Sequence, residues 1–386
     1  GGAFGLARST IGQMAVRIAL QCSEADSQLI LDDDNVAARL LSRPGEAIYN
    51  DVGGSVAGNS PFQTAWLPDS VRDSYLSRVA ELQEGRKPAR EELIVFEGSV
   101  DADITENRQL AACLADENRT AEVSAPKMWL GAPVTIKDPT SVALRRQSGA
   151  NVLIIGQRED VAMNLMTAAV VSLAAQLPEP AVRFVILDGS PPDSPQAGQL
   201  PRATEVLSHA CQFVPWRGVP DVLTELAQEV ETRTQADQRN AQTVIVLIYG
   251  LQRYRVLRRS EDAFGFSLDE EAQARPDAQF ADLLREGPSV GIHVLAWVDT
   301  LSSLERTLDR RTLREFDHRV LFQMSATDSS NLIDSPIANQ LGLHRALLYS
   351  EEQGRIEKFR PYARFPDDWL ARVAEQLARK NPAGTE

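Results

Sequence analysis

The stretch VLIIGQREDVAMNLMTAAVVSLAAQ, Val152–Gln176, decides how the rest of the chain is interpreted. Four apolar residues lead to Gly156, a short polar turn follows, and the apolar periodicity predicts a long helix over Asp160–Gln176. A strand, a glycine-containing turn and a helix form the frame in which many proteins cradle phosphate groups. The turn lacks the Gly-Lys-Ser/Thr of such a cradle, so the frame is present here without the residues that usually act in it.

A working phosphate loop reads G-x-x-x-x-G-K-[ST]. Its glycines let backbone N–H groups wrap the phosphates, its lysine reaches the β and γ oxygens, and its hydroxyl binds magnesium. Counted from Gly156, the second glycine, the lysine and the hydroxyl fall on Val161, Ala162 and Met163. Val161 is β-branched and poorly suited to the backbone angles that glycine supplies, and Ala162 carries no charge. The phosphate-binding half of the site is therefore predicted to be degenerate.

The acidic residues of this region are not where ATP hydrolysis needs them. Glu159 and Asp160 place two carboxylates at the amino end of the helix, where they can cap free N–H groups without any ligand. The strand predicted over Thr243–Tyr249 ends in Ile248 and Tyr249, where a hydrolase would carry the acids that hold magnesium and activate water. With both halves changed, we expect this domain not to hydrolyse ATP.

Strand and helix patterns alternate over residues 128–360, which predicts an α/β fold with a mostly parallel sheet covered by helices on both faces. The predicted strands are Val152–Ile155, Arg183–Leu187, Gln212–Pro215, Thr243–Tyr249, His293–Val298, His318–Phe322 and Ala346–Tyr349. The predicted helices are Asp160–Gln176, Val219–Gln235, Asp277–Arg285, Leu301–Leu308 and a terminal amphipathic helix, Asp367–Lys380.

Two segments, one from Val16 and one from His318, resemble each other. In each copy a strand leads through a polar turn to a helix and then to a second strand that ends at a tyrosine. Their separation is that of a duplicated domain and not of a short solenoid repeat. The matched residues are Arg17/Arg319, Gln21/Gln323, Ser23/Ser325, Asp26-Ser27/Asp328-Ser329, Asp32/Asp334 and Tyr49/Tyr349.

The repeat sets the predicted domain organisation. The second copy is preceded by a full series of strands and helices, whereas the first copy is not, so we expect the chain to be the carboxy-terminal part of a longer polypeptide. The predicted segments are a remnant of a first module (1–50), a connector (51–127), a complete but degenerate module (128–366), and a terminal helix and tail (367–386). The connector contains a helix candidate at 70–84 and a strand-like stretch at 92–98.

Composition narrows the classes of function. The formal net charge is −14, so a nucleic-acid backbone would have to be bound by a local basic patch. The three cysteines and four histidines show no metal-ligand spacing, and we expect no metal site and no disulfide framework. The sequence shows neither a signal peptide nor a membrane-spanning run, which predicts a cytoplasmic location for this portion and leaves an upstream membrane anchor open.

One local basic patch is LQRYRVLRR, residues 251–259. Arg253, Arg255, Arg258 and Arg259 surround a tyrosine there and are candidates for contact with a nucleic-acid backbone or an acidic partner. The alternative is a solvated loop face that pairs with the acids of SLDEEAQ, residues 267–273. The sequence leaves both interpretations open.

The paired blocks resemble the FtsK/SpoIIIE branch of the RecA-like (HerA/FtsK) motor ATPases. The resemblance rests on R-hydrophobic-x-x-Q-x-S-x-x-D-S with its downstream Leu-Leu-x-x-x-G and tyrosine, and on LLREGPSVGIHVLAWVDT, residues 283–300. The frame GANVLIIGQ (149–157), the helix after it and RFVILDG (183–189) extend the likeness. It covers most of Leu130–Tyr349 and, as a remnant, the first fifty residues. Tandem modules of this kind also resemble the ATPases of type VII secretion systems.

The resemblance implies a RecA-like P-loop NTPase fold and, for the parent protein, an ATP-driven DNA translocase. ATP and magnesium would bind in an upstream module and not in this chain, whose degenerate module would serve assembly, regulation or docking. One alternative is a type VII secretion-like ATPase whose degenerate module binds a protein substrate, and another is a non-enzymatic interaction protein. The implied partners are neighbouring ATPase modules or subunits of an oligomer, DNA through the parent protein, or a protein substrate.

The resemblance also implies a role for one arginine. In this family an arginine of the repeated block is a candidate for reaching the γ-phosphate in a neighbouring subunit, which would make Arg17 a trans-acting arginine. The alternative for Arg17 is an ion pair with a nearby carboxylate. For Arg319, which belongs to the degenerate module, the ion pair is favoured.

Overall fold

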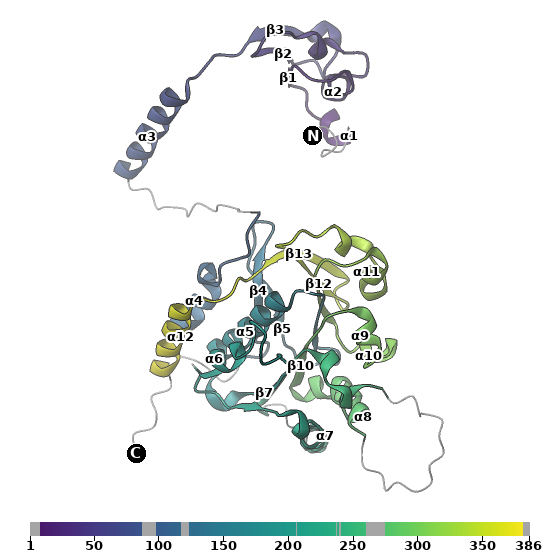
Figure 1. Cartoon of the computed structure of the whole chain (residues 1–386). Helices are drawn as coiled ribbons and strands as arrows, with labels where there is room; N and C mark the ends of the chain where they lie inside the picture. Colours follow the sequence, from purple (N-terminus) through teal and green to yellow (C-terminus); the bar gives the residue numbers. More distant parts are fainter. Residues whose placement is uncertain are drawn as a thin grey trace. The chain divides into compact units, whose positions relative to one another are not determined.

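The computed structural model describes residues 8–86, 98–116, 123–205, 207–236, 238, 241–259 and 275–380. The chain forms two compact units, Gly1–Ile94 and Val95–Glu386 (Figure 1). The division falls inside the segment that the sequence predicts to be a connector. The predicted strand at 92–98 lies almost wholly outside the described residues, and the helix predicted at 70–84 is α3 (Asp69–Arg86).

The second unit is built on a ten-stranded sheet with a parallel and an antiparallel part. In spatial order the strands are β5 (Thr140–Ala143), β4 (Lys127–Pro133), β13 (Arg355–Pro361), β12 (Ala346–Ser350), β11 (His318–Leu321), β6 (Val152–Ile155), β10 (Ile292–Val298), β9 (Thr243–Tyr249), β7 (Val182–Asp188) and β8 (Cys211–Phe213). From β11 to β8 neighbouring strands are parallel, and from β5 to β11 they are antiparallel. The predicted α/β fold is confirmed, and the sequence missed β4, β5 and β13.

Helices cover both faces of this sheet (Figure 1). On one face α5 (Glu159–Gln176) and α6 (Gln199–Glu205) share an apolar core with the strands. The opposite core contains α7 (Val219–Gln235), α8 (Pro276–Glu286), α9 (Leu301–Glu305) and α11 (Ala326–Ile333). The short helix α10 (Arg310–Leu313) precedes β11. Two layers of helices around one sheet are the arrangement that the alternating pattern predicts.

Helix α5 is apolar on all sides because it is packed on all sides. One side of α5 packs on the sheet, and a second side forms a separate core with α4 (Arg108–Ala115) and α12 (Asp367–Lys380). Figure 1 shows α4 and α12 next to each other, outside α5. A helix that is hydrophobic all round is expected only where it is enclosed. The predicted terminal helix therefore completes the enclosure of the central one.

The first unit is a small antiparallel sheet in the order β1 (Arg17–Leu20), β2 (Glu46–Asn50), β3 (Ser60–Gln63). The helices are α1 (Arg8–Gly12), α2 (Glu24–Ile30) and α3. Its core consists of Ala19, Leu31, Ala38 and Ile48. Strand β3 lies within the predicted connector, as does α4 of the second unit, so both ends of that segment belong to folded units.

The internal repeat is present in the structure, where β1, α2 and β2 correspond to β11, α11 and β12. Its signature is a shared set of hydrogen bonds from Arg17 and Arg319. Each guanidinium donates to the backbone carbonyl three residues before it, to the one six residues before it, and to a carbonyl at the end of the following helix. The acceptors are Met14 (3.0 Å), Ile11 (3.3 Å) and Ile30 (3.3 Å) for Arg17, and Phe316 (3.1 Å), Leu313 (3.3 Å) and Leu332 (2.6 Å) for Arg319.

Two matched serines repeat the same geometry. The buried Ser27 hydroxyl donates to a carbonyl eight residues later (2.8 Å) and accepts from the N–H of Ala38 (3.3 Å). Ser329 donates to a carbonyl six residues later and accepts from the N–H of Ala338 (3.2 Å). These bonds fix the turn after each helix, so the two copies share local geometry as well as residues.

The predicted match of Tyr49 with Tyr349 is wrong by one position. Tyr49 pairs with Ile18 across the first sheet, whereas Tyr349 pairs with Arg319 across the second. Counted from the matched arginines, Tyr49 lies where Leu348 lies. Because side chains alternate between the faces of a sheet, the two tyrosines point to opposite faces. The Arg319 guanidinium lies 5.5 Å from the Tyr349 ring centre, a contact that Tyr49 does not copy.

Candidate functional site

The carboxyl ends of β6, β9 and β10 form the edge at which ligands bind in open α/β sheets. Only the three residues of 156–158 separate β6 from α5. A loop of the form G-x-x-x-x-G-K-[ST] needs a longer connection before its lysine. Ala162 and Met163, which the sequence places at the lysine and hydroxyl positions, consequently lie within α5 with their side chains buried in the apolar core, as does Val161.

Gly156 is held by packing. Its φ of +133° lies in the region that favours glycine, and its carbonyl accepts a hydrogen bond from the indole N–H of Trp297 at 3.0 Å. A Cβ at this position would lie 2.8 Å from the Cβ of Phe322. The space beside the glycine is thus filled by an aromatic side chain of the chain itself.

The end of β9 is filled in the same way. The Tyr249 ring lies 4.6 Å from the Trp297 ring, and its hydroxyl donates to the Glu159 carbonyl at 3.2 Å. Burial, followed by the nearby Glu159 carboxylate, raises the pKa of Tyr249 well above its usual range. Ile248 is buried in the core on the other face of the sheet. The two positions at which a hydrolase would carry its metal-binding acids therefore hold a core aliphatic residue and a neutral phenol.

Both carboxylates at the start of α5 face arginines. Arg158 forms a bidentate ion pair with Asp160, with Nε–Oδ1 at 3.0 Å and Nη2–Oδ2 at 2.9 Å. Arg158 also donates to the Leu343 carbonyl at 2.6 Å. The Arg158 hydrogen bond is the main reason why the pKa of Asp160 is lowered. Arg253 Nη2 lies 3.4 Å from Glu159 Oε1. Where a phosphate loop would present free N–H groups and a cation, this edge presents two ion pairs.

The basic run is only partly free. Arg253 donates to the Gly189 carbonyl as well as facing α5, and Arg258 donates to a backbone carbonyl of its own turn at 3.0 Å. The side chains of Arg255 and Arg259 are exposed. Contact between a polyanion and these four arginines stays a prediction. Arg253 and Arg258 already donate hydrogen bonds to backbone carbonyls of this chain.

An aromatic pair lies beside this run. Tyr254 is buried, and its ring stacks at 4.2 Å on the half-exposed ring of Trp216. The acidic stretch at 267–273, the alternative partner for the arginines, lies outside the described residues. The stack explains why a tyrosine interrupts the basic run, since it anchors the turn to the 3-10 turn at Trp216–Gly218.

Arg17 lies in the first unit and directs its guanidinium at its own backbone. In the described part of the chain its partners are the three carbonyls that define the repeat and the carbonyl of Leu31. Its counterpart Arg319 makes, in addition, an ion pair with Glu351, as predicted for the second copy. A trans-acting role for Arg17 stays a prediction. The sequence could not show that both arginines tie a strand to the end of the next helix.

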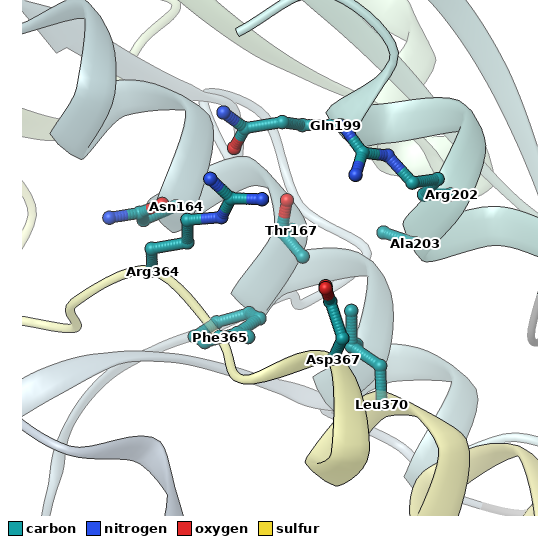
Figure 2. A pocket seen from close by; sticks show the side chains of 9 residues that line it. All are labelled: Asn164, Thr167, Gln199, Arg202, Ala203, Arg364, Phe365, Asp367 and Leu370. Atoms are coloured by element: carbon teal, nitrogen blue, oxygen red, sulfur yellow. The ribbon is translucent and has the colours of Figure 1, made fainter. Parts of the chain in front are cut away.

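Figure 2 shows a cavity between α5, α6 and the segment that leads into α12. Its volume of about 30 Å³ has room for a water molecule or two and none for a nucleotide. The lining residues are Asn164, Thr167, Gln199, Arg202, Ala203, Arg364, Phe365, Asp367 and Leu370. Several polar side chains point into this space, which makes it suitable for ordered water between the helices.

Among the described residues, no group of three or more histidine, cysteine, aspartate and glutamate side chains is placed to hold a metal ion. Within the same ranges, no helix is both long and apolar enough to cross a membrane.

No protein-family model and no curated protein matches the sequence. Solved structures do match. The cytoplasmic domain of the Thermomonospora curvata type VII secretion ATPase EccC has a TM-score of 0.57 at 14% identity, covering 99% of this chain and 46% of that chain. The pCW3 conjugation coupling protein TcpA, a monomer with ATPγS, has a TM-score of 0.50 at 12% identity, covering 87% of this chain and 91% of that chain.

A third structure contains ATPases 2 and 3 of T. curvata EccC in complex with a signal sequence peptide. Its TM-score is 0.45 at 14% identity, and the match covers 68% of this chain and 48% of that chain. At these identities a likeness establishes the fold. The chain thus spans about half the length of the EccC cytoplasmic domain, and it has the RecA-like fold of the FtsK/SpoIIIE-family ATPases.

Proposed function

We propose that this chain is part of a tandem RecA-like ATPase of the type VII secretion kind, in which the second unit does not hydrolyse ATP and acts as a docking module for a protein substrate. The fold likeness to the EccC cytoplasmic domain supports this, because it extends over 99% of the chain and so includes both units. Assembly or regulation of neighbouring ATPase modules is the further task of such a unit.

The observation that carries the proposal is the closed amino end of α5. A triphosphate arriving there would meet the carboxylates of Glu159 and Asp160, and it would have to displace Arg158 and Arg253 from them. The triphosphate and these two carboxylates carry like charges, which repel each other in a partly buried site, and Ala162 supplies no cation where a phosphate loop has its lysine. Tyr249 offers neither a magnesium ligand nor a base.

ATP and magnesium would accordingly be bound by another module. In this proposal Arg17 belongs to the block that lies near a neighbour's nucleotide, and it would act there as the trans-acting arginine. The second unit would hold its neighbours in place without a nucleotide cycle of its own. An oligomer of such chains is the natural assembly, because a trans-acting group needs a second subunit.

A DNA translocase is the second candidate. The likeness to the TcpA coupling protein covers 87% of this chain, and the exposed Arg255 and Arg259 offer two cations to a phosphate backbone. A net charge of −14 opposes it, since DNA would be repelled at long range. For this reason the secretion-type function is preferred.

The direct test of the closed site is titration of the chain with Mg-ATP in a calorimeter. We expect no binding at millimolar nucleotide. The double substitution Ala162→Lys with Met163→Thr should fail to create binding and should lower stability, since position 162 is buried in an apolar core. Tight binding of Mg-ATP to the unmodified chain would contradict the proposal.

The choice between protein and DNA needs a paired titration. A fluorescent secretion-signal peptide and a fluorescent DNA duplex are titrated with the chain at low and physiological salt, read by anisotropy. Peptide binding that survives Arg255→Glu with Arg259→Glu supports the docking module. Duplex binding that those two substitutions abolish, with no peptide binding, would favour the translocase.

A further inference from the structure

The repeat allows the first unit to be compared with a covered copy of itself. Four apolar positions share one face of the β1–β2–β3 sheet, and the matched arginines and the sheet registers give each a counterpart in β11–β12–β13. The first set, with exposed fractions, is Ile18 (59%), Leu20 (56%), Tyr49 (37%) and Phe62 (38%). The second set is Val320 (0%), Phe322 (2%), Leu348 (8%) and Phe359 (0%).

The second set is buried because two elements cover it. All four side chains belong to the core formed with α5, and β6 pairs in parallel with the edge of β11 that faces away from β12. In the first unit the corresponding edge of β1 is unpaired within the described residues, since β1 ends the sheet order. By comparison with the second unit, the four exposed side chains lie where a helix equivalent to α5 would pack, and the free edge of β1 lies where a strand equivalent to β6 would pair.

An exposed face of this kind is unusual. Soluble proteins seldom leave a contiguous apolar patch next to an unpaired strand edge, because such a surface promotes association. A parallel strand would satisfy the free N–H and C=O groups of β1, and a helix across the four side chains would remove them from water. In the second unit β6 pairs with β11 in this way, and α5 packs on the four matched side chains.

We propose that this face binds a four-residue apolar strand, parallel to β1, and the helix that follows it, both supplied by a segment of the same polypeptide upstream of residue 1. The repeat supports that source, because β6 and α5 precede β11 in the chain, so their counterparts would precede β1. The EccC cytoplasmic domain, of which the match covers 46%, is an example of a longer polypeptide with this fold. That the strand and helix come from the same polypeptide rests on the proposed tandem arrangement. That a strand and a helix are expected at all rests on the internal repeat alone.

The register of the missing strand follows from the second unit. Arg319 lies opposite Leu153, the second residue of β6. We therefore expect Arg17 to lie opposite the second residue of the upstream strand. The helix should begin within a few residues of that strand, as α5 does after β6, and should run across Ile18 and Leu20.

The test is hydrogen exchange, read by mass spectrometry, on residues 1–386 and on the protein lengthened at its amino end by its own upstream residues. We expect amides of β1 to exchange about 100-fold more slowly in the longer protein. Amides of β11 serve as the internal control and should not change. Equal exchange of β1 in both proteins would overturn the proposal.

A matched pair of variants separates coverage from general stability. In the longer protein Ile18→Asp should return β1 to fast exchange, whereas Leu40→Asp, at an exposed position of the 3-10 turn Ala37–Leu40, should leave it protected. In the short chain both variants should behave like the wild type. Protection of β1 that instead appears in the short chain as its concentration rises would assign the face to a second copy and overturn the upstream source. Titration calorimetry with Mg-ATP measures binding to the second unit, whereas exchange of β1 amides measures coverage of the first. The proposed function and the proposal for this face can therefore fail independently.

Discussion

Strands β1 and β11 have the same local geometry and opposite surroundings. Arg17 and Arg319 donate to carbonyls at the same sequence distances, and Ser27 and Ser329 hold equivalent turns. Yet the outer face of β1 is open where that of β11 is enclosed by α5. The comparison teaches that hydrogen bonds within a short segment specify its shape, whereas burial depends on elements supplied from elsewhere in the sequence.

The largest contrast should come from shortening matched apolar side chains. Phe322→Ala removes a buried ring packed over the glycine of the β6–α5 turn, and should lower the free energy of unfolding of the second unit by about 3–5 kcal/mol. Leu20→Ala at the matched exposed position should change that of the first unit by less than about 0.5 kcal/mol. Urea unfolding monitored by hydrogen exchange resolves the two units. Similar losses in both would remove the basis of the comparison.

Acid should destabilise the second unit more than the first through its histidines. All four histidines lie in the second, where burial lowers the pKa of His293 from 6.5 to about 4 and also lowers that of His318. Between pH 6.5 and about pH 4, the imidazole of His293 is protonated in the unfolded chain but stays neutral in the folded one. The free energy of unfolding of the second unit should therefore fall as pH drops from about 6.5 to 4, by about 3 kcal/mol for His293.

The measurement is the urea midpoint of each unit at pH 7 and pH 4.5. Carboxylates titrate in both units, so His293→Gln is the control, and it should flatten the pH dependence of the second unit. If the variant kept the full slope, the histidine would not be its source.

A smaller difference is expected between the two arginines. Arg319→Met leaves Glu351 without its partner and three carbonyls without a donor in a buried setting, and should cost about 2–3 kcal/mol. Arg17→Met removes the same carbonyl contacts near solvent and should cost about 1 kcal/mol. Chemical denaturation of both variants measures the two losses in free energy of unfolding. A larger loss for Arg17→Met than for Arg319→Met would contradict this prediction.

The smallest effect should be equal in the two copies. Ser27→Ala and Ser329→Ala each remove a buried hydroxyl that accepts one N–H and donates to one carbonyl, so each should cost about 1 kcal/mol. Unfolding midpoints of the two units measure this directly. A difference well beyond 1 kcal/mol would show that the turns are not equivalent, although their bonds are.

Much of the fold could be predicted because its parallel half is made of buried apolar runs. Val152–Ile155 and Thr243–Tyr249 are found where the sequence places them. Three strands of the antiparallel half, β4, β5 and β13, were missed. Strand β5 has four residues, and β13 begins with the largely exposed Arg355–Lys358 before it enters the core. Short or half-exposed strands give weak periodicity, and their pairing depends on distant residues.

The candidate site divides in the same way. The missing lysine and acids could be predicted from the sequence, because they are single residues in a known frame. What fills the edge could not, since Trp297 reaches Gly156 across 141 residues and Tyr249 reaches Glu159 across 90. The ion pair of Arg158 with Asp160, two residues apart, is the one element of this arrangement with a local signal.

Gly156 has a consequence for how such sequences are compared. A glycine at the end of the first strand is commonly counted as a trace of phosphate binding, but here the neighbouring phenylalanine and the positive φ are enough to require it. The residue would resist replacement even if no nucleotide had ever been bound. In a chain of this fold, motif scores that reward this glycine measure aromatic packing and overstate kinship with working ATPases.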